Sequence, residues 1–227
     1  MMYIYNNRCH FNWLIENTFF QKYIFVYMNI RFLFFATFTL SFILVACSGS
    51  FTDSRDGQGY DVVKIGNLSW MAENLNYATE MSVCPDGDSR NCKRLGRLYS
   101  WAEAKTVCPE GWRLPTKSDF AQLLTQPNAG AALKSRDGWF KKGNGSDEFG
   151  FNALPAGYRG AVLKTDDGTV TGGKFDGIGG YAYFWSADED AENPESNAFY
   201  LFLSFSSDAA SLNAFAKEDY RSVRCVR

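Results

Sequence analysis

The chain is almost devoid of histidine: its 227 residues include one, His10. Histidine is the commonest general base near neutral pH and a common metal ligand. Catalysis by the rest of the chain would therefore have to use carboxylates, tyrosine, lysine or a thiol. No Cys-x-x-Cys spacing occurs either, which argues against the usual zinc and dithiol redox motifs.

Basic runs and tandem repeats are also absent, and the formal net charge is −2. Nucleic-acid-binding proteins present a clustered positive surface to the phosphate backbone. The charge pattern therefore excludes nucleic acid as an expected partner.

Residues 32–46 form an apolar run that is too short for a membrane span, which needs about 20 residues. Arg31 precedes the run, and Leu44-Val45-Ala46 leads directly into Cys47. A cationic start, an apolar core and small residues before a cut are typical of an export signal. The four residues Leu44-Val45-Ala46-Cys47 resemble the lipobox of bacterial lipoproteins. This resemblance implies that Cys47 becomes the first mature residue, carries diacylglycerol, and anchors the protein in the cell envelope, at the outer membrane or cell surface.

Four segments follow from this interpretation. Residues 1–27 are expected to be a miscalled upstream extension, since Met28 begins a normal short signal peptide by itself, although Met1 stays an alternative start. Residues 28–46 are the signal peptide, 47–56 a lipidated tether, and 57–227 one domain, a length that suits a single core.

The remaining cysteines of the mature chain are Cys84, Cys92, Cys108 and Cys225. An even set in an exported protein indicates disulfides, and four cysteines allow three pairings. We favour Cys84–Cys92 and Cys108–Cys225. A metal or catalytic thiol site is the alternative.

The pattern of apolar residues predicts an α+β domain. Capping-box spacing predicts a helix opening at Ser100. Thr116 as a cap, with Asp119 in the first turn complementing the helix dipole, predicts another, and a short third helix is expected at 129–133. A glycine turn at 66–67 predicts a hairpin over 62–71. Residues 135–180 read as a long loop region, and strands are expected at 181–185, 199–205, 212–215 and 222–226.

A series of motifs, in order along the chain, resembles the Fibrobacter succinogenes major paralogous domain, which often occurs on exported bacterial lipoproteins. The motifs occupy residues 56–66, 70–77, 96–101, 108–116, 149–157, 184–186 and 222–226. A wider resemblance, carried by Gly-Trp-Arg-Leu-Pro-Thr at 111–116 and Val-Arg-Cys-Val at 223–226, is to the C-type lectin-like superfamily. It implies two helices packed on a twisted antiparallel sheet with a long loop region, and the Cys108–Cys225 pairing matches that layout.

Aromatic residues beside glycine-rich loops are the candidate ligand-binding residues: Trp139, Tyr158, Tyr181 and Tyr183. Their faces would suit sugar rings in a mostly apolar site. The alternative is that each belongs to the core.

Acidic residues suggest two further sites. The stretch 188–195 offers oxygen ligands for calcium, but it lacks the Glu-Pro-Asn and Trp-Asn-Asp signatures of calcium-binding lectins, so a solvated acidic loop is the alternative. Asp147, Glu148, Asp166, Asp167 and Asp176 could contain a glycosidase pair, although acidic residues beside glycine usually mark turns.

The sequence therefore predicts a lipid-anchored, non-catalytic binding or adhesion module with no cofactor, whose ligand is a polysaccharide. A structural surface-assembly protein that binds other proteins is the second hypothesis. The third comes from the formylglycine-generating enzymes of the lectin-like superfamily, which need reactive cysteines.

Overall fold

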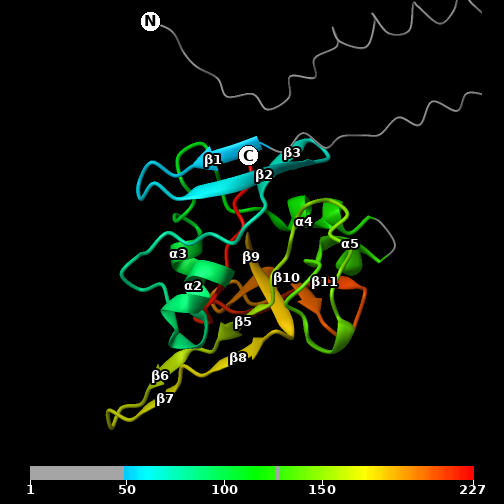
Figure 1. Cartoon of the computed structure of the whole chain (residues 1–227). Coiled ribbons are helices and arrows are strands. Elements are labelled where there is room, and N and C mark those ends of the chain that lie inside the picture. The colour runs from blue at the N-terminus through cyan, green and yellow to red at the C-terminus, as the bar shows by residue number, and fades with distance from the viewer. Residues whose placement is uncertain (1–48, 126–127) are drawn as a thin grey trace, which may run out of the picture. The chain divides into compact units, whose positions relative to one another are not determined.

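Two main sheets organise residues 49–125 and 128–227, the parts of the chain that the computed structural model describes (Figure 1). The first has the strand order β1-β2-β3, and the second the order β11-β10-β9-β12-β4. Two small hairpins pair β5 with β8 and β6 with β7. The strand bounds are β1 Gly49–Thr52, β2 Gly59–Ile65, β3 Leu68–Met71, β4 Leu98–Tyr99, β5 Ala156–Arg159, β6 Val162–Lys164, β7 Val170–Gly172, β8 Phe175–Ile178, β9 Tyr181–Glu189, β10 Asn197–Ser204, β11 Ala210–Ala216 and β12 Arg221–Ser222.

The larger sheet is mixed, whereas the sequence predicts an antiparallel one. β12 runs parallel to β9, with Ser222 opposite Phe184, and antiparallel to β4. The last strand, β12, therefore lies between β4, which comes first in the sequence, and β9, the central strand of the sheet. The predicted hairpin over 62–71 is present as β2 and β3, with Ile65 opposite Leu68.

Within the described residues, four short helices accompany the sheets: α2 Ser89–Leu95, α3 Trp101–Ala104, α4 Lys117–Leu123 and α5 Ala129–Leu133. Two 3-10 turns, η1 (Pro85–Gly87) and η2 (Phe140–Lys142), complete the set. Both predicted caps, Ser100 and Thr116, are confirmed, and each forms a capping box, with Glu103 and Asp119 respectively. α2 was not foreseen. Its cap is Asp88, whose side chain accepts a hydrogen bond from the Arg90 backbone N–H.

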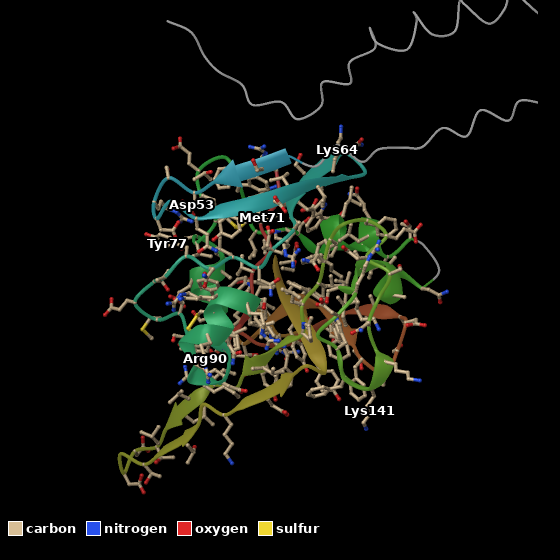
Figure 2. All side chains as sticks on the ribbon, viewed as in Figure 1. Asp53, Lys64, Met71, Tyr77, Arg90 and Lys141 are labelled. Atoms are coloured by element: carbon tan, nitrogen blue, oxygen red, sulfur yellow. A yellow bond between two sulfur atoms is a disulfide. The ribbon has the colours of Figure 1, made fainter. Side chains whose placement is uncertain are left out.

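The core forms on the inner face of the larger sheet. Phe184 of β9 and Leu201 and Leu203 of β10 are fully buried there against Phe120 and Leu123 of α4. A neighbouring cluster joins Trp185 to Met71 of β3, which lies inside the molecule (Figure 2). No helix in the described ranges is long and apolar enough to cross a membrane.

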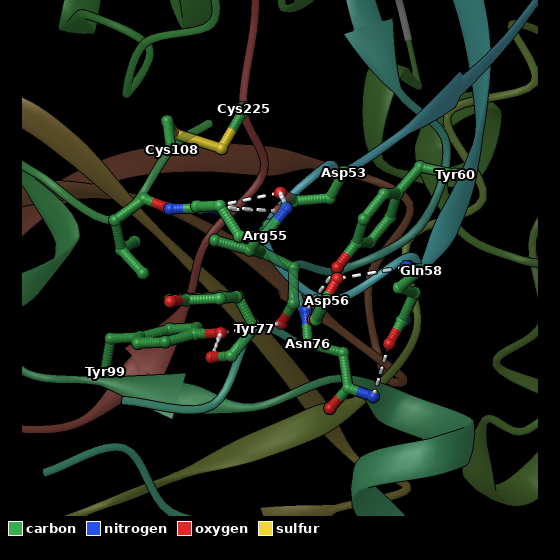
Figure 3. A network of polar contacts seen from close by, with 12 residues as sticks. Asp53, Arg55, Asp56, Gln58, Tyr60, Asn76, Tyr77, Tyr99, Cys108 and Cys225 are labelled. Atoms are coloured by element: carbon green, nitrogen blue, oxygen red, sulfur yellow. Dashed lines mark hydrogen bonds and ion pairs between the residues drawn. A yellow bond between two sulfur atoms is a disulfide. The ribbon is translucent and has the colours of Figure 1, made fainter. Parts of the chain in front are cut away.

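The folded domain begins before residue 57, where the sequence placed its start. β1 pairs with β2 from Gly49 onwards, so part of the expected tether, Gly49–Thr52, belongs to the sheet. The turn after β1 is held by the fully buried Asp53, whose carboxylate pairs with Arg55 at 2.6 Å. Arg55 also donates to the Val107 carbonyl at 2.9 Å and lies 3.9 Å from the centre of the Tyr77 ring (Figure 3). The hydrogen bond from Arg55 lowers the pKa of Asp53. Cys47 and the segments 1–27 and 28–46 lie outside the described residues.

Two disulfides join Cys84 to Cys92 and Cys108 to Cys225, so the favoured pairing is confirmed. Together they engage every cysteine of the described part. Paired cysteines persist in oxidising compartments, which indicates an extracytoplasmic domain. The second bridge spans 117 residues and ties the middle of the chain to its end.

Removing the long bridge should cost far more stability than removing the short one. In the chain-entropy model, Cys108→Ala/Cys225→Ala lowers the free energy of unfolding by about 4–5 kcal/mol, and Cys84→Ala/Cys92→Ala by roughly 2–3 kcal/mol. Urea denaturation of the two double variants measures both values. Equal losses, or a larger loss for the short bridge, would contradict the closing role given to Cys108–Cys225.

Candidate ligand-binding face

Five half-buried aromatic side chains lie together on the outer face of the larger sheet, and we call them the aromatic face: Tyr158, Tyr181, Tyr183, Tyr200 and Phe202. They come together because alternate residues of a strand point to the same side. Phe202 of β10 stands opposite Tyr183 of β9, with ring centres 5.1 Å apart. Tyr158 arrives from β5 and packs on Tyr183 at 5.2 Å. Tyr181 lies over Phe202 at 5.7 Å.

This outer face differs sharply from the inner one. The inner residues Ala182, Phe184 and Leu201 are at most 1% exposed, whereas each ring of the aromatic face keeps part of its surface in water. Half-exposed aromatic residues bring a flat apolar surface and, in tyrosine, a polar hydroxyl group. The face can therefore bind a ligand that has both apolar and hydroxyl-bearing surfaces.

Arg221 of β12 lies beneath these rings and is 2% exposed. Its guanidinium carbon is 4.0 Å from the Tyr200 ring centre and 5.0 Å from that of Tyr183. Its Nη2 donates to the carboxylate of Asp219 at 2.8 Å, and Asp219, itself buried, accepts a second bond from the Ala161 N–H. Burial lowers the pKa of Arg221 and raises that of Asp219. The rings thus rest on a buried ion pair that fixes their positions.

The tyrosine hydroxyl groups of the aromatic face have no protein partner within the described residues, and none of them is a buried unpaired atom. They differ in this from Tyr60 and Tyr99, whose hydroxyl groups bond to the backbone. On the same face, Asn213 of β11 stands opposite Tyr200. The Asn213 side-chain amide donates to Ser211 Oγ at 3.0 Å. Flat rings that carry hydroxyl groups offer both stacking and hydrogen bonding.

Trp139 does not join this surface. Its side chain is 6% exposed and packs in the core beneath α4. Its indole N–H donates to Ser135 Oγ at 3.0 Å and to the Ala153 carbonyl at 3.2 Å. Because its ring faces are covered and its one donor is used, the indole matches the alternative core reading. We leave Trp139 out of the proposed ligand surface.

A separate acidic cleft of about 300 Å³ lies between β2, the segment after β3 and the loop before β5. Its charged lining residues are Asp61, Glu73, Arg136, Asp137 and Asp147. Burial raises the pKa of both Glu73 and Asp147. Two carboxylates accept backbone N–H groups, Glu73 from Asp61 and Asp147 from Asn152, each at 2.7 Å. These bonds hold the walls of the cleft together.

A fully buried arginine, Arg224, lies next to this cleft and electrostatically balances Glu73 and Asp147. Its guanidinium donates to Asn74 Oδ1 at 2.6 Å and to the carbonyl groups of Met71 and Phe151. The carboxylates therefore compensate a buried cation, which is a structural role.

Other acidic side chains accept hydrogen bonds within turns or form an ion pair. In the β9–β10 loop, Asp190 accepts the Glu192 N–H and the Asn193 side-chain amide, and Glu189 pairs with Lys217 at 2.9 Å. In the β6–β7 turn, Asp167 accepts from Thr165 and Thr169. Across residues 49–125 and 128–227, no three His, Cys, Asp or Glu residues are grouped to hold a metal ion. Calcium binding therefore gains no support from these side chains.

Comparison with known proteins identifies the family. The family model of the Fibrobacter succinogenes major domain matches residues 63–227, so the chain belongs to this family. No curated protein and no solved structure matches it. The matched region contains all five residues of the aromatic face.

Sequence reasoning found three of these five residues and missed Tyr200, Phe202 and the supporting Arg221. The sequence did contain a signal for Tyr200 and Phe202. Residues 199–205 are apolar on both faces of the strand, and an apolar outer face needs either a cover or a ligand. Nothing in the sequence showed that Arg221 would be buried.

Loss of the buried cation should destabilise the domain strongly. Arg221→Ala leaves the Asp219 carboxylate buried without its partner, which costs about 3–5 kcal/mol. The double variant Arg221→Met/Asp219→Asn should recover most of this loss because it removes both charges and keeps the volume. Urea denaturation with the disulfides intact measures both variants. A cost below about 1 kcal/mol for Arg221→Ala, the value of an exposed pair, would refute the supporting role.

Proposed function

We propose that this protein is a lipid-anchored, non-catalytic binding module of the bacterial cell envelope, and that the aromatic face binds polysaccharide. The observation that carries the proposal is the group of half-exposed tyrosine rings with unpaired hydroxyl groups. Pyranose rings present apolar C–H faces and equatorial hydroxyl groups, which match stacking and hydrogen bonding respectively. An extended sheet face suits an extended polymer better than a small molecule.

A C-type lectin-like fold is part of the proposal. It is supported by the capped α4 helix after residues 111–115, by the long disulfide to the last strand, and by the position of the chain end. Ser69 of β3 exchanges backbone hydrogen bonds with Arg227, which places the C-terminus beside the first sheet. The proposal takes the sheet face rather than a calcium loop as the ligand site.

The proposal that the module is non-catalytic rests on the oxidised state of its cysteines. An enzyme like the formylglycine-generating enzymes needs reactive thiols, and here Cys84, Cys92, Cys108 and Cys225 are in disulfides. In the acidic cleft, the carboxylates of Glu73 and Asp147 accept backbone N–H groups and compensate the charge of Arg224.

One observation favours the second function, a surface-assembly protein that binds other proteins. The β6–β7 hairpin projects from the body (Figure 1) and exposes Val162, Leu163 and Val170 by 46%, 59% and 64%. Exposed apolar side chains grouped on one element are typical of protein contacts. This hairpin lies in a different part of the fold from the aromatic face, so the two functions can be tested separately.

Alanine at the aromatic face should weaken polysaccharide binding and leave protein contacts intact. Tyr181→Ala and Tyr200→Ala are expected to weaken binding about tenfold or more, as central aromatic anchors do, while Leu163→Ala is the matched control and binds normally. Polysaccharide pull-down with the full-length chain in mild detergent measures this. In vivo crosslinking of the same three variants tests the assembly function, which predicts loss of a dominant protein adduct only in Leu163→Ala. Failure of the unaltered protein to bind any envelope or plant polysaccharide would overturn the proposal.

The lipid anchor has its own test. Cys47→Ser should lose fatty-acid labelling and leave the membrane fraction, because the acylated sulfur is the proposed attachment point. Cys9→Ser, upstream of the cut, is the control and should stay labelled. A Cys47→Ser protein that keeps both label and membrane association would contradict the anchor.

A further inference from the structure

One edge of the larger sheet lacks the usual protection against pairing with another strand. β11 is the edge strand, and within the described ranges no strand pairs with its outer side. It is seven residues long, Ala-Ser-Leu-Asn-Ala-Phe-Ala, with no charge and no proline. Natural sheets protect such edges with charges, proline, bulges or short strands. β11 has none of these features.

The other edges of the two main sheets are shorter than β11 or are covered. β4 at the opposite edge has two residues and is bridged by Val83. The β3 edge of the first sheet is covered by the C-terminal segment, which bonds to Ser69 and Met71. β1 at the last edge is only four residues long. The contrast singles out β11, whose Phe215 is also 57% exposed.

We propose that β11 pairs antiparallel with β11 of a second copy of this chain, which joins the two five-stranded sheets into one. In such an isologous contact the same strand is used on both copies. Alternate residues of an antiparallel edge strand point their N–H and C=O groups outward, so each copy offers the groups that the other needs.

The alternation of side chains and the charged residues beside β11 limit the register of this pairing. Opposite residues must lie on the same face of the sheet, which allows a two-fold axis at Leu212, Asn213 or Ala214. An axis at Leu212 sets Ser211 opposite Asn213 and Ala210 opposite Ala214, and no like charges meet between residues 207 and 217. An axis at Asn213 would set Asp208 opposite Glu218, which like-charge repulsion disfavours. An axis at Ala214 sets Asp208 opposite Tyr220 and also avoids like charges, so charge excludes the axis at Asn213 alone. The proposal takes the axis at Leu212, which the cysteine variant below tests.

The choice of a second copy over a foreign strand follows from this self-complementarity. A neutral strand that pairs with itself meets no charge conflict and needs no partner of matching charge. Tyr200 is the cross-strand neighbour of Asn213, so the dimer would set two aromatic faces on the same side of one sheet. The pairing itself does not depend on polysaccharide binding.

A charge placed on the edge tests the proposal. Asn213→Lys puts a lysine on each of the two paired strands, and Asn67→Lys in the exposed β2–β3 turn is the matched control. Sedimentation velocity of the full-length chain in mild detergent should show a concentration-dependent dimer for the unaltered protein and for Asn67→Lys. For Asn213→Lys the midpoint should move to at least about tenfold higher concentration, in line with the role of edge lysines in blocking strand pairing. Thermal melting checks that each variant is folded.

A second variant locates the axis. Leu212→Cys places a cysteine opposite its own copy, within reach of a disulfide across an antiparallel pair, and should give a covalent dimer on mild oxidation. Asn67→Cys, away from the edge, should not. A monomer at every concentration, or a dimer unaffected by Asn213→Lys, would overturn the proposal whatever the outcome of the polysaccharide assays.

Discussion

The final segment, residues 221–227, is the constraint on which the rest of the structure depends. It enters the larger sheet between β9 and β4, then bonds to β3 through Met71 and Ser69 and to the segment before α4 through Arg113. The Cys108–Cys225 bridge fixes it covalently to the middle of the chain. The two main sheets therefore share one strand-like segment, and neither can form its complete set of hydrogen bonds until the end of the chain is in place.

Two buried arginines of this segment, Arg221 and Arg224, lie beneath the aromatic face and beside the acidic cleft, respectively. Both are desolvated, which is costly unless each is hydrogen-bonded or paired. Arg221 is compensated by Asp219 and by the tyrosine rings of the outer face. Arg224 is compensated by backbone carbonyl groups and, at longer range, by the carboxylates of the acidic cleft. The aromatic face and the cleft are thus supported by two arginines of one segment, Arg221 in β12 and Arg224 just after it. This explains how a sheet face can hold several half-exposed rings in fixed positions without a covering helix.

Local signals in the sequence predicted much of this fold. The caps at Ser100 and Thr116, the 62–71 hairpin and the two disulfides are confirmed. Each cap or turn depends on residues of a single motif, and the disulfides depend on an even set of cysteines. What the sequence did not reveal depends on tertiary contacts. Residues 47–56 were taken as a tether because pairing of β1 with β2 and burial of Asp53 against Arg55 are not visible locally. The same reasoning placed Trp139 on the surface, since glycine-rich neighbours do not show which side of a ring the core covers.

Native-state hydrogen exchange of the full-length chain tests the central role of the final segment most directly. The backbone N–H groups of Met71, Leu75 and Arg113 donate to carbonyl groups of residues 225, 223 and 226. If the segment closes both sheets, these amides exchange only through global unfolding, with the same free energy as the most protected amides of β9 and β10. Exchange of the three amides at a clearly lower free energy, while β9 and β10 stay protected, would show that the segment detaches by itself and would contradict the account.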